Sequence, residues 1–107
     1  NYYPSSMTRG AQVFYRRDGE NSKFLATCIQ ERLNEAYSKH RVKGRSIAWG
    51  EYYMLECTSY PSVIVECGFL SNAKEAELLC DKEYQEKVAW AIHLGILRYL
   101  NSSPLQE

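Results

Sequence analysis

The sequence predicts an α/β fold, with helices packed in three layers on a mixed, largely parallel sheet. A short β-branched run over 63–65, with turn-forming residues on either side, is typical of a strand buried on both faces. Two long segments, about 22–38 and 82–100, repeat apolar residues at three- and four-residue intervals, as amphipathic helices do. Two or three short strands are too few to cover both helices. We therefore expect residues 1–107 to be the incomplete C-terminal portion of a single domain.

The first half of the chain predicts one strand and one long helix. Residues 1–10 are rich in Tyr, Pro, Ser and Gly, which predicts an irregular loop leading into a strand over 11–15. A polar turn follows. Asn21 or Ser22 is then expected to cap the helix that ends near Ser38.

The basic segment 39–45, Lys-His-Arg-Val-Lys-Gly-Arg, leaves two interpretations open. It can be an anion-binding patch, or a solvated loop whose cations suit the negative end of the preceding helix dipole. We favour the solvated loop. Beyond it, the apolar residues near 53–56 predict a weak strand.

The stretch 61–72, Pro-Ser-Val-Ile-Val-Glu-Cys-Gly-Phe-Leu-Ser-Asn, predicts a strand, a loop and a helix start. Glu66 ends the apolar strand, where burial without a partner would disfavour its charge. Asn72 and Glu75 have the spacing of an N-cap and its capping-box partner, which predicts a short helix. Asp81 predicts the cap of the last helix, whose wide apolar stripe predicts burial on more than one side.

Composition and charge exclude several classes of function. Hydrophobic residues make up 45% of the chain and charged residues 24%, which is typical of a globular domain and excludes a disordered one. The net charge is zero, so no bulk attraction to nucleic acid or to an anionic membrane is expected. No apolar run is long enough for a membrane span, and no signal peptide is visible. The cysteines lack zinc-knuckle spacing; Cys28 and Cys80 are expected in the core, and a disulfide involving Cys57 stays open.

Glu66 is the first residue expected to carry chemistry, because sites in open α/β sheets lie at the carboxyl ends of strands. It can act as a general base or acid or as a metal ligand. It can also be a buried structural carboxylate paired with Arg9 or Arg45. Cys67 is not expected to be a nucleophile, because strand alternation turns it to the other face and neither histidine has a matching spacing.

Loop tyrosines and the two histidines carry weaker signals. His40 belongs to the basic loop, and His93 is expected to be a satisfied core or boundary residue rather than a ligand. Tyrosines in predicted loops can pack on sugars or peptides, although ordinary loop packing is the commoner role. These are Tyr2, Tyr3, Tyr52, Tyr53 and Tyr60.

The stretch 61–72 resembles the central motif of the zinc-dependent N-acetylmuramoyl-L-alanine amidases of bacterial cell walls, which include autolysins and spore-cortex amidases. Val-Glu-x-Gly-Phe-Leu-Ser-Asn followed by Glu75 is a specific pattern, and the resemblance extends over essentially the whole chain. Further matching residues are Arg9 to Tyr15, Leu79, Tyr84, Gln85, Ala89, Ala91, Ile92, Gly95, Ile96 and Tyr99. The resemblance implies hydrolysis of the bond between N-acetylmuramic acid and L-alanine of the peptidoglycan stem.

The resemblance also implies roles for single residues. In the family two histidines and a glutamate hold one zinc ion, and a second glutamate, here Glu66, takes a proton from the zinc-bound water and returns it to the leaving amine. Asn72, Ser71 and Arg9 are the expected substrate-binding residues. No residue of this chain matches a zinc ligand. Asn1 looks like the Asn that follows the last ligand, so the ligands are expected upstream of it and the fragment alone is expected to be inactive.

The expected setting follows from the same resemblance. It implies action outside the cytoplasm, in the cell wall or spore cortex, on peptidoglycan, and it allows a regulatory protein partner. The alternative is a non-catalytic, amidase-like module that binds the cell wall or another protein.

Overall fold

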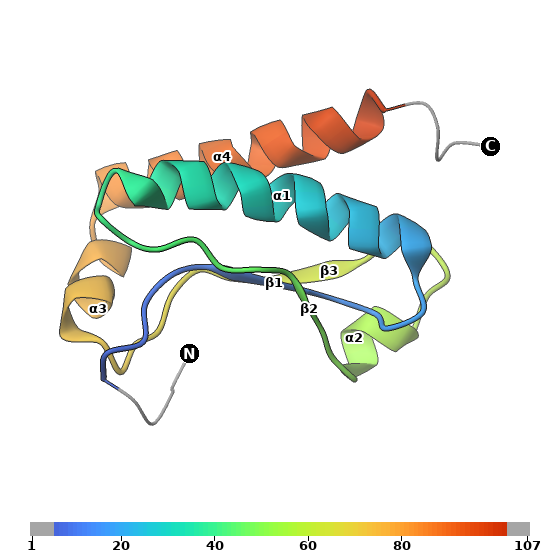
Figure 1. Cartoon of the computed structure of the whole chain (residues 1–107), viewed down its shortest axis with the longest axis horizontal. Helices are drawn as coiled ribbons and strands as arrows, with labels where there is room; N and C mark the ends of the chain where they lie inside the picture. The colour runs from blue at the N-terminus through green and yellow to red at the C-terminus, as the bar shows by residue number, and fades with distance from the viewer. Residues whose placement is uncertain (1–5, 103–107) are drawn as a thin grey trace.

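The computed structural model describes residues 6–102, and within them it contains three strands and four helices. In chain order these are β1 (Gln12–Tyr15), α1 (Glu20–Ser38), β2 (Ala48–Trp49), α2 (Tyr53–Glu56), β3 (Val63–Glu66), α3 (Ala73–Leu79) and α4 (Lys82–Leu100). Figure 1 shows the sheet beneath the two long helices, with α2 and α3 near its opposite ends. The predictions for Asn1, Tyr2 and Tyr3 lie outside the described residues.

The sheet is mixed, as the sequence predicts, and its strand order is β2-β1-β3. β1 pairs in parallel with β2 and antiparallel with β3. In the antiparallel pairing Gln12 lies opposite Glu66, and Val13 lies opposite Val65. Opposed residues of such a pair point to the same face of the sheet, so this register decides which side chains share a face with Glu66.

Both long helices lie on one side of the sheet. α1 packs on β1, and α4 runs antiparallel alongside α1 (Figure 1). The rings of Tyr37 and Tyr84 meet at one end of this helix pair, and those of Phe24 and Tyr99 meet at the other. Residues 6–102 therefore form two of the three predicted layers, the sheet and one layer of helices.

The core lies between the sheet and α1 and continues between α1 and α4. Its buried members are Ala11, Val13, Tyr15, Ala26, Ile29, Leu33, Tyr37, Val42, Tyr84, Val88 and Ala91. The two helices are in close contact at Gly95, where a Cβ atom would lie 2.6 Å from Ile29 Cα. Any side chain at position 95 would therefore push the helices apart.

Two elements differ from the sequence prediction. Residues 53–56 form one helical turn rather than the predicted strand; Leu55 is its buried residue, and Cys57 N donates a hydrogen bond to Tyr53 O at 3.0 Å. α1 begins at Glu20, before the predicted caps. Its N-cap position makes no side-chain hydrogen bond, and the Ser22 hydroxyl instead accepts one from Ser62 N at 2.9 Å.

Burial differs from the prediction at the edges of the helix layer. Cys28 is buried as predicted, but Cys80 is exposed at the end of α3, and all four cysteines are free. His93 is exposed and packs against the ring of Trp90, which is itself 60% exposed. His93 and Trp90 are exposed because α1 covers only one stripe of α4. Residues 6–102 therefore leave part of the wide apolar surface of α4 uncovered, although it was predicted to be buried on more than one side.

Candidate functional site

The two faces of the sheet differ in what covers them. Val13 of β1 is fully buried against α1, and strand alternation turns Gln12 and Phe14 to the other side. We call this other side the open face. Through the register it also carries Ile64 and Glu66 of β3. All four residues of β3 are partly buried rather than buried on both faces as predicted, since neither long helix covers the open face.

Glu66 stands on the open face at the carboxyl end of β3. Within the described part of the chain its carboxylate forms neither a hydrogen bond nor an ion pair, so it is not joined to Arg9 or Arg45. The side chain is only partly buried. A carboxylate without a structural partner at a strand end is available to accept and donate protons.

Glu75, in the first turn of α3, is the buried structural carboxylate of this region. Its side chain is 1% exposed; Oε1 accepts a hydrogen bond from Phe69 N at 2.8 Å, and Oε2 accepts one from Gly10 N at 2.6 Å. The guanidinium Nε of Arg9 lies 3.8 Å from Oε2. These donors offset the cost of removing the charge from water. Glu75 therefore ties the segment before β1 to the loop after β3.

Asn72 strengthens the same tie. Its Oδ1 accepts the predicted N-cap bond from Glu75 N at 3.0 Å, and its Nδ2 donates to Ser6 O at 2.8 Å. The capping box is incomplete, because the carboxylate of Glu75 binds Phe69 N instead of Asn72 N. Asn72 is 9% exposed and both polar atoms of its amide are engaged. Its predicted contact with substrate therefore stays a prediction. Its two hydrogen bonds join the segment before β1 to the start of α3, and we call this pair of bonds the clamp.

Arg9 and Ser71, the other residues predicted to bind substrate, lie on the two segments that this clamp joins. Ser71 is partly buried in the loop between β3 and α3. The Arg9 side chain is 26% exposed, and its buried Nε and Nη2 atoms have no hydrogen-bond partner. The structure thus brings both residues to the end of the sheet at which Glu66 stands.

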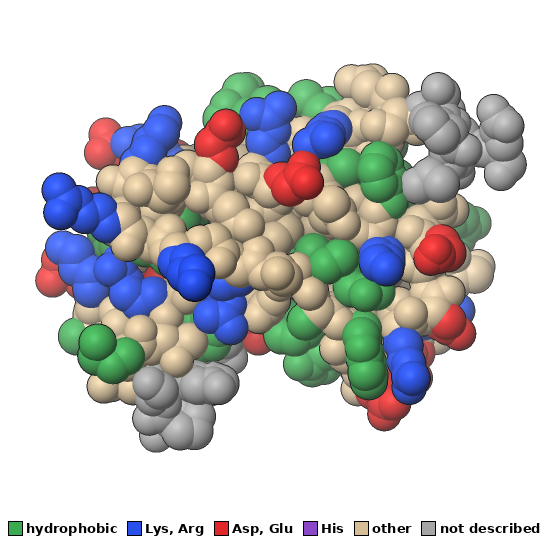
Figure 2. All heavy atoms as spheres, viewed as in Figure 1, with side chains coloured by type: hydrophobic (Ala, Val, Ile, Leu, Met, Phe, Trp, Pro, Cys, Tyr) green, Lys and Arg blue, Asp and Glu red, His purple; other side chains and the backbone are tan. Residues whose placement is uncertain are grey.

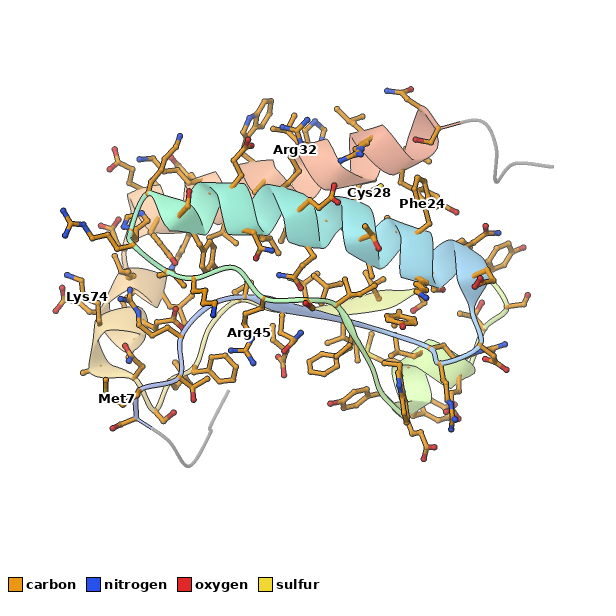
Figure 3. The ribbon with its side chains drawn as sticks, viewed as in Figure 1. Met7, Phe24, Cys28, Arg32, Arg45 and Lys74 are labelled. Atoms are coloured by element: carbon orange, nitrogen blue, oxygen red, sulfur yellow. The ribbon has the colours of Figure 1, made fainter. Side chains whose placement is uncertain are left out.

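Arg45 is held beside this site by contacts on every part of the residue. Asn34 accepts a hydrogen bond from Arg45 N at 3.1 Å and donates one to Arg45 O at 2.8 Å. The Nε of Arg45 donates to Gln12 Oε1 at 3.2 Å, and Nη1 donates to Arg9 O at 3.3 Å. Its guanidinium carbon lies 5.0 Å from the centre of the Phe69 ring. In Figure 3 the side chain lies below the ribbon of β1, away from the two long helices.

Sequence reasoning missed this fixed arginine and placed it in a solvated loop. The signal that could have found it is a pair of polar residues, Gln30 and Asn34, one turn apart on the sheet-facing side of α1. Gln30 is 3% exposed; it accepts from Val13 N at 2.9 Å and donates to Ala11 O at 3.0 Å. It also donates to Asn34 Oδ1 at 3.0 Å. Polar residues so placed need partners, and here they hold the start of β1 and the end of the basic segment.

Cys67 and the histidines do not form a site with Glu66. Cys67 packs against the core, on the face opposite Glu66, as alternation predicts. Burial raises the pKa of its thiol, and the nearby charge of Glu66 raises this pKa further, so the thiolate that a nucleophile needs is disfavoured. His40 packs edge-on against Tyr84. Among residues 6–102 no three His, Cys, Asp or Glu side chains are grouped so that they could hold a metal ion.

Sequence comparisons relate this fold to a group of known proteins. A family model described as N-acetylmuramoyl-L-alanine amidase matches residues 1–98. The chain is 37% identical over 99 residues to the germination-specific N-acetylmuramoyl-L-alanine amidase of Bacillus subtilis, a match covering 92% of this chain and 41% of that protein. It is 33% identical over 101 residues to the N-acetylmuramoyl-L-alanine amidase LytC of the same organism, covering 92% of this chain and 20% of that protein.

Solved structures give the same relationship. The CwlD amidase from Clostridioides difficile, in complex with the GerS lipoprotein, matches with a TM-score of 0.88 and 46% identity, over 94% of this chain and 50% of that one. The catalytic domain of the CwlV amidase from Paenibacillus polymyxa matches with a TM-score of 0.82 and 34% identity, over 94% and 54%. The chain thus spans between a fifth and about half of the length of these relatives.

Proposed function

Because the chain belongs to the N-acetylmuramoyl-L-alanine amidase family, we propose that the protein containing it hydrolyses the bond between N-acetylmuramic acid and L-alanine of the peptidoglycan stem. The observation that carries this proposal is the position of Glu66, on the open face at the end of β3 and without a partner among residues 6–102. The names of the relatives, which are amidases of this specificity, support it.

In this proposal Glu66 moves the proton. Hydrolysis of an amide requires a water molecule to lose a proton as it attacks the carbonyl and the departing amine to gain one. A single carboxylate at the strand end can do both in turn. Glu75 cannot serve in this way, because both of its oxygens are engaged by backbone N–H groups.

Zinc enters the proposal through the family alone. The residues that the structure describes do not fit a zinc site, since they include no group of three potential ligands. We propose that the working enzyme binds one zinc ion through residues other than 6–102. Arg9, Ser71 and Asn72 stay the residues proposed to contact substrate, and Asn72 also holds the two segments together through its hydrogen bonds to Ser6 and Glu75.

Replacing Glu66 with glutamine tests the proposal, because glutamine keeps the shape of the side chain and cannot accept the proton. The rate of hydrolysis, measured as new amino-terminal L-alanine released from purified peptidoglycan, should fall by about 10³-fold. Glu77→Gln, at an exposed position of α3, is the matched control and should leave the rate unchanged. A Glu66→Gln protein with full activity would overturn the assignment.

The alternative is an amidase-like module that binds the cell wall or another protein without cleaving. Plasma mass spectrometry of the purified protein separates the two, because the enzyme should contain about one zinc ion per chain. A zinc-free protein that sediments with peptidoglycan and releases no L-alanine would establish the module instead.

The proposed setting is the cell wall or the spore cortex, outside the cytoplasm, because the relatives include a germination-specific amidase. No helix in the described part of the chain is long and apolar enough to cross a membrane. We also propose a regulatory protein partner, since the similar CwlD amidase forms a complex with a lipoprotein. Affinity purification from sporulating cells, followed by mass spectrometry, should recover such a partner together with the protein.

A further inference from the structure

A depression of about 360 Å³ lies between the segment before β1 and the segment that follows α1. Four of its lining residues are cations, and none is an acid; we call these four, Arg9, Arg41, Lys43 and Arg45, the basic pocket. Figure 2 shows Lys and Arg side chains gathered at this end of the molecule, while acidic and basic groups are more evenly mixed elsewhere on the same face. The pocket therefore concentrates positive charge in a chain whose net charge is zero.

Three of the four cations of the basic pocket lack a counter-charge among residues 6–102. Arg41, Lys43 and Arg45 form no ion pair with any residue in the described range 6–102. Arg9 lies 3.8 Å from Glu75, but its Nε and Nη2 atoms are buried and donate no hydrogen bond. Like charges gathered in this way repel one another, and an anion bound among them would relieve the repulsion and use the unpaired donors.

The pocket is anchored on one side by Arg45, whereas Arg41 and Lys43 are exposed. Arg45 is fixed through its backbone by Asn34 and through its guanidinium by Gln12. The absence of a side chain at Gly10 leaves room for the aliphatic part of the Arg45 side chain, because a Cβ atom at position 10 would lie 3.0 Å from Arg45 Cδ. Arg41 has a φ of 60°, a left-handed conformation that few residues other than glycine adopt. A guanidinium held in place loses little freedom on binding, which favours recognition of a carboxylate through paired hydrogen bonds.

The pocket lies next to the end of the sheet that carries Glu66. Gln12 is the link, because it lies opposite Glu66 across the β1–β3 pairing and its Oε1 accepts the hydrogen bond from Arg45. Opposed residues of an antiparallel pair share a face, so Arg45 contacts a direct neighbour of Glu66 on the open face. A substrate held at Glu66 would therefore have this positive charge within reach.

We propose that the basic pocket binds a free carboxylate of the peptidoglycan stem peptide. This inference rests on the proposed function. The L-alanine amine is the leaving group of the reaction, so the stem peptide extends from the cleaved bond into the site, and it carries carboxylates at its acidic residues and at its end. The pocket would select charged stems and orient them relative to Glu66, a role separate from proton transfer.

Binding of stem peptides that lack the sugar tests the pocket without any cleavage. The intact protein would be titrated calorimetrically with a stem peptide that has free carboxylates and with the same peptide fully amidated. The variant combines Arg41→Asn and Lys43→Gln. Asparagine tolerates the left-handed backbone, and both positions are exposed, so the fold should be retained. Lys23→Gln, an exposed lysine at the far end of α1, is the control.

We expect the double variant to bind the free stem about tenfold more weakly than the unaltered protein and the amidated stem less than about twofold more weakly. The control should match the unaltered protein with both peptides. Equal weakening for both peptides, or none for either, would overturn the proposal. A second result would also overturn it. If the unaltered protein and the Lys23→Gln control bound a glycerol phosphate oligomer tightly and the double variant did not, a wall polymer would be the ligand.

The outcome is independent of the amidase proposal, since these peptides contain no scissile bond. A protein that binds charged stems through this pocket yet releases no L-alanine would retain the inference and refute the activity. A protein that hydrolyses peptidoglycan through Glu66 but is indifferent to stem charge would do the reverse.

Discussion

The end of β3 and the first turn of α3 each present a glutamate, and their surroundings are opposite. Glu75 is buried and receives hydrogen bonds from two backbone N–H groups, with a guanidinium nearby. Glu66 is partly exposed on the open face and has no partner among residues 6–102. A carboxylate whose bonds are all satisfied holds structure together, whereas one that is left unsatisfied beside solvent can exchange protons. The partners of the two side chains therefore distinguish their roles.

Removing the buried carboxylate gives the largest expected effect on this comparison. Glu75→Ala should lower the free energy of unfolding by about 3 kcal/mol, because it leaves two buried N–H groups and the Arg9 charge without their acceptor. Glu66→Ala should change it by less than about 0.5 kcal/mol. Urea denaturation measures both, with Glu77→Ala as the exposed control on α3. Equal losses at positions 66 and 75 would break the comparison.

A second change concerns Asn72, whose hydrogen bonds join the segment before β1 to the start of α3. Asn72→Ala should cost about 2 kcal/mol of stability, because it removes the N-cap of α3 and the bond to Ser6. Asn72→Asp keeps the cap acceptor and loses only the donor, so about 1 kcal/mol is expected. If Asn72 instead served mainly to contact substrate, KM would rise for both variants while their thermal unfolding stayed the same.

A third change concerns the backbone next to Glu66. The hydroxyl of Tyr37 donates to Cys67 O at 2.5 Å, and Tyr37→Phe should cost about 1 kcal/mol. Burial raises the pKa of Tyr37 far above its usual value of 10.0, so the folded state holds the neutral phenol. The neutral Tyr37 phenol therefore contributes fully to the free energy of unfolding below pH 10. This contribution is lost as the pH rises beyond 10, because Tyr37 then ionises in the unfolded chain. Denaturation followed above pH 10 should show a shallower decline in Tyr37→Phe than in the unaltered protein.

The smallest effect is expected at Cys67. Burial raises the pKa of this thiol, so iodoacetamide at pH 8 should alkylate it more slowly than the exposed Cys57. Cys67→Ala should leave the hydrolysis rate unchanged within about twofold. Mass spectrometry of the alkylated peptides gives the order of reaction. Loss of activity on modification of Cys67 alone would place chemistry on the covered face of the sheet.

Local features of the fold could be predicted from the sequence. Asn72 and Asp81 cap α3 and α4 as predicted, because a cap depends on residues within one turn. The strand ending at Glu66 and the opposite orientation of Cys67 follow from apolar runs and alternation. These are the parts of the structure that neighbouring residues decide.

Features that depend on distant partners could not be predicted. Glu75 receives its bond from Gly10, 65 residues away, and Arg45 binds Gln12, 33 residues away. The sequence left Glu66 open to pairing with Arg9 or Arg45 and gave Glu75 only a capping role, but the packing of the loops places Glu75, not Glu66, beside Arg9. The fixed position of Arg45 in the basic segment could not be predicted for the same reason, since it comes from Asn34 on α1.

The close contact at Gly95 bears on the order of folding. Glycine within a helix lowers its intrinsic stability by about 1 kcal/mol relative to alanine, so α4 forms less readily by itself than its other residues allow. The same glycine permits the approach to Ile29 that joins α4 to α1 across the intervening strands. Helix formation and docking are thereby made to depend on one another. This couples the last helix to the first and favours an all-or-none transition over the survival of a partly folded chain.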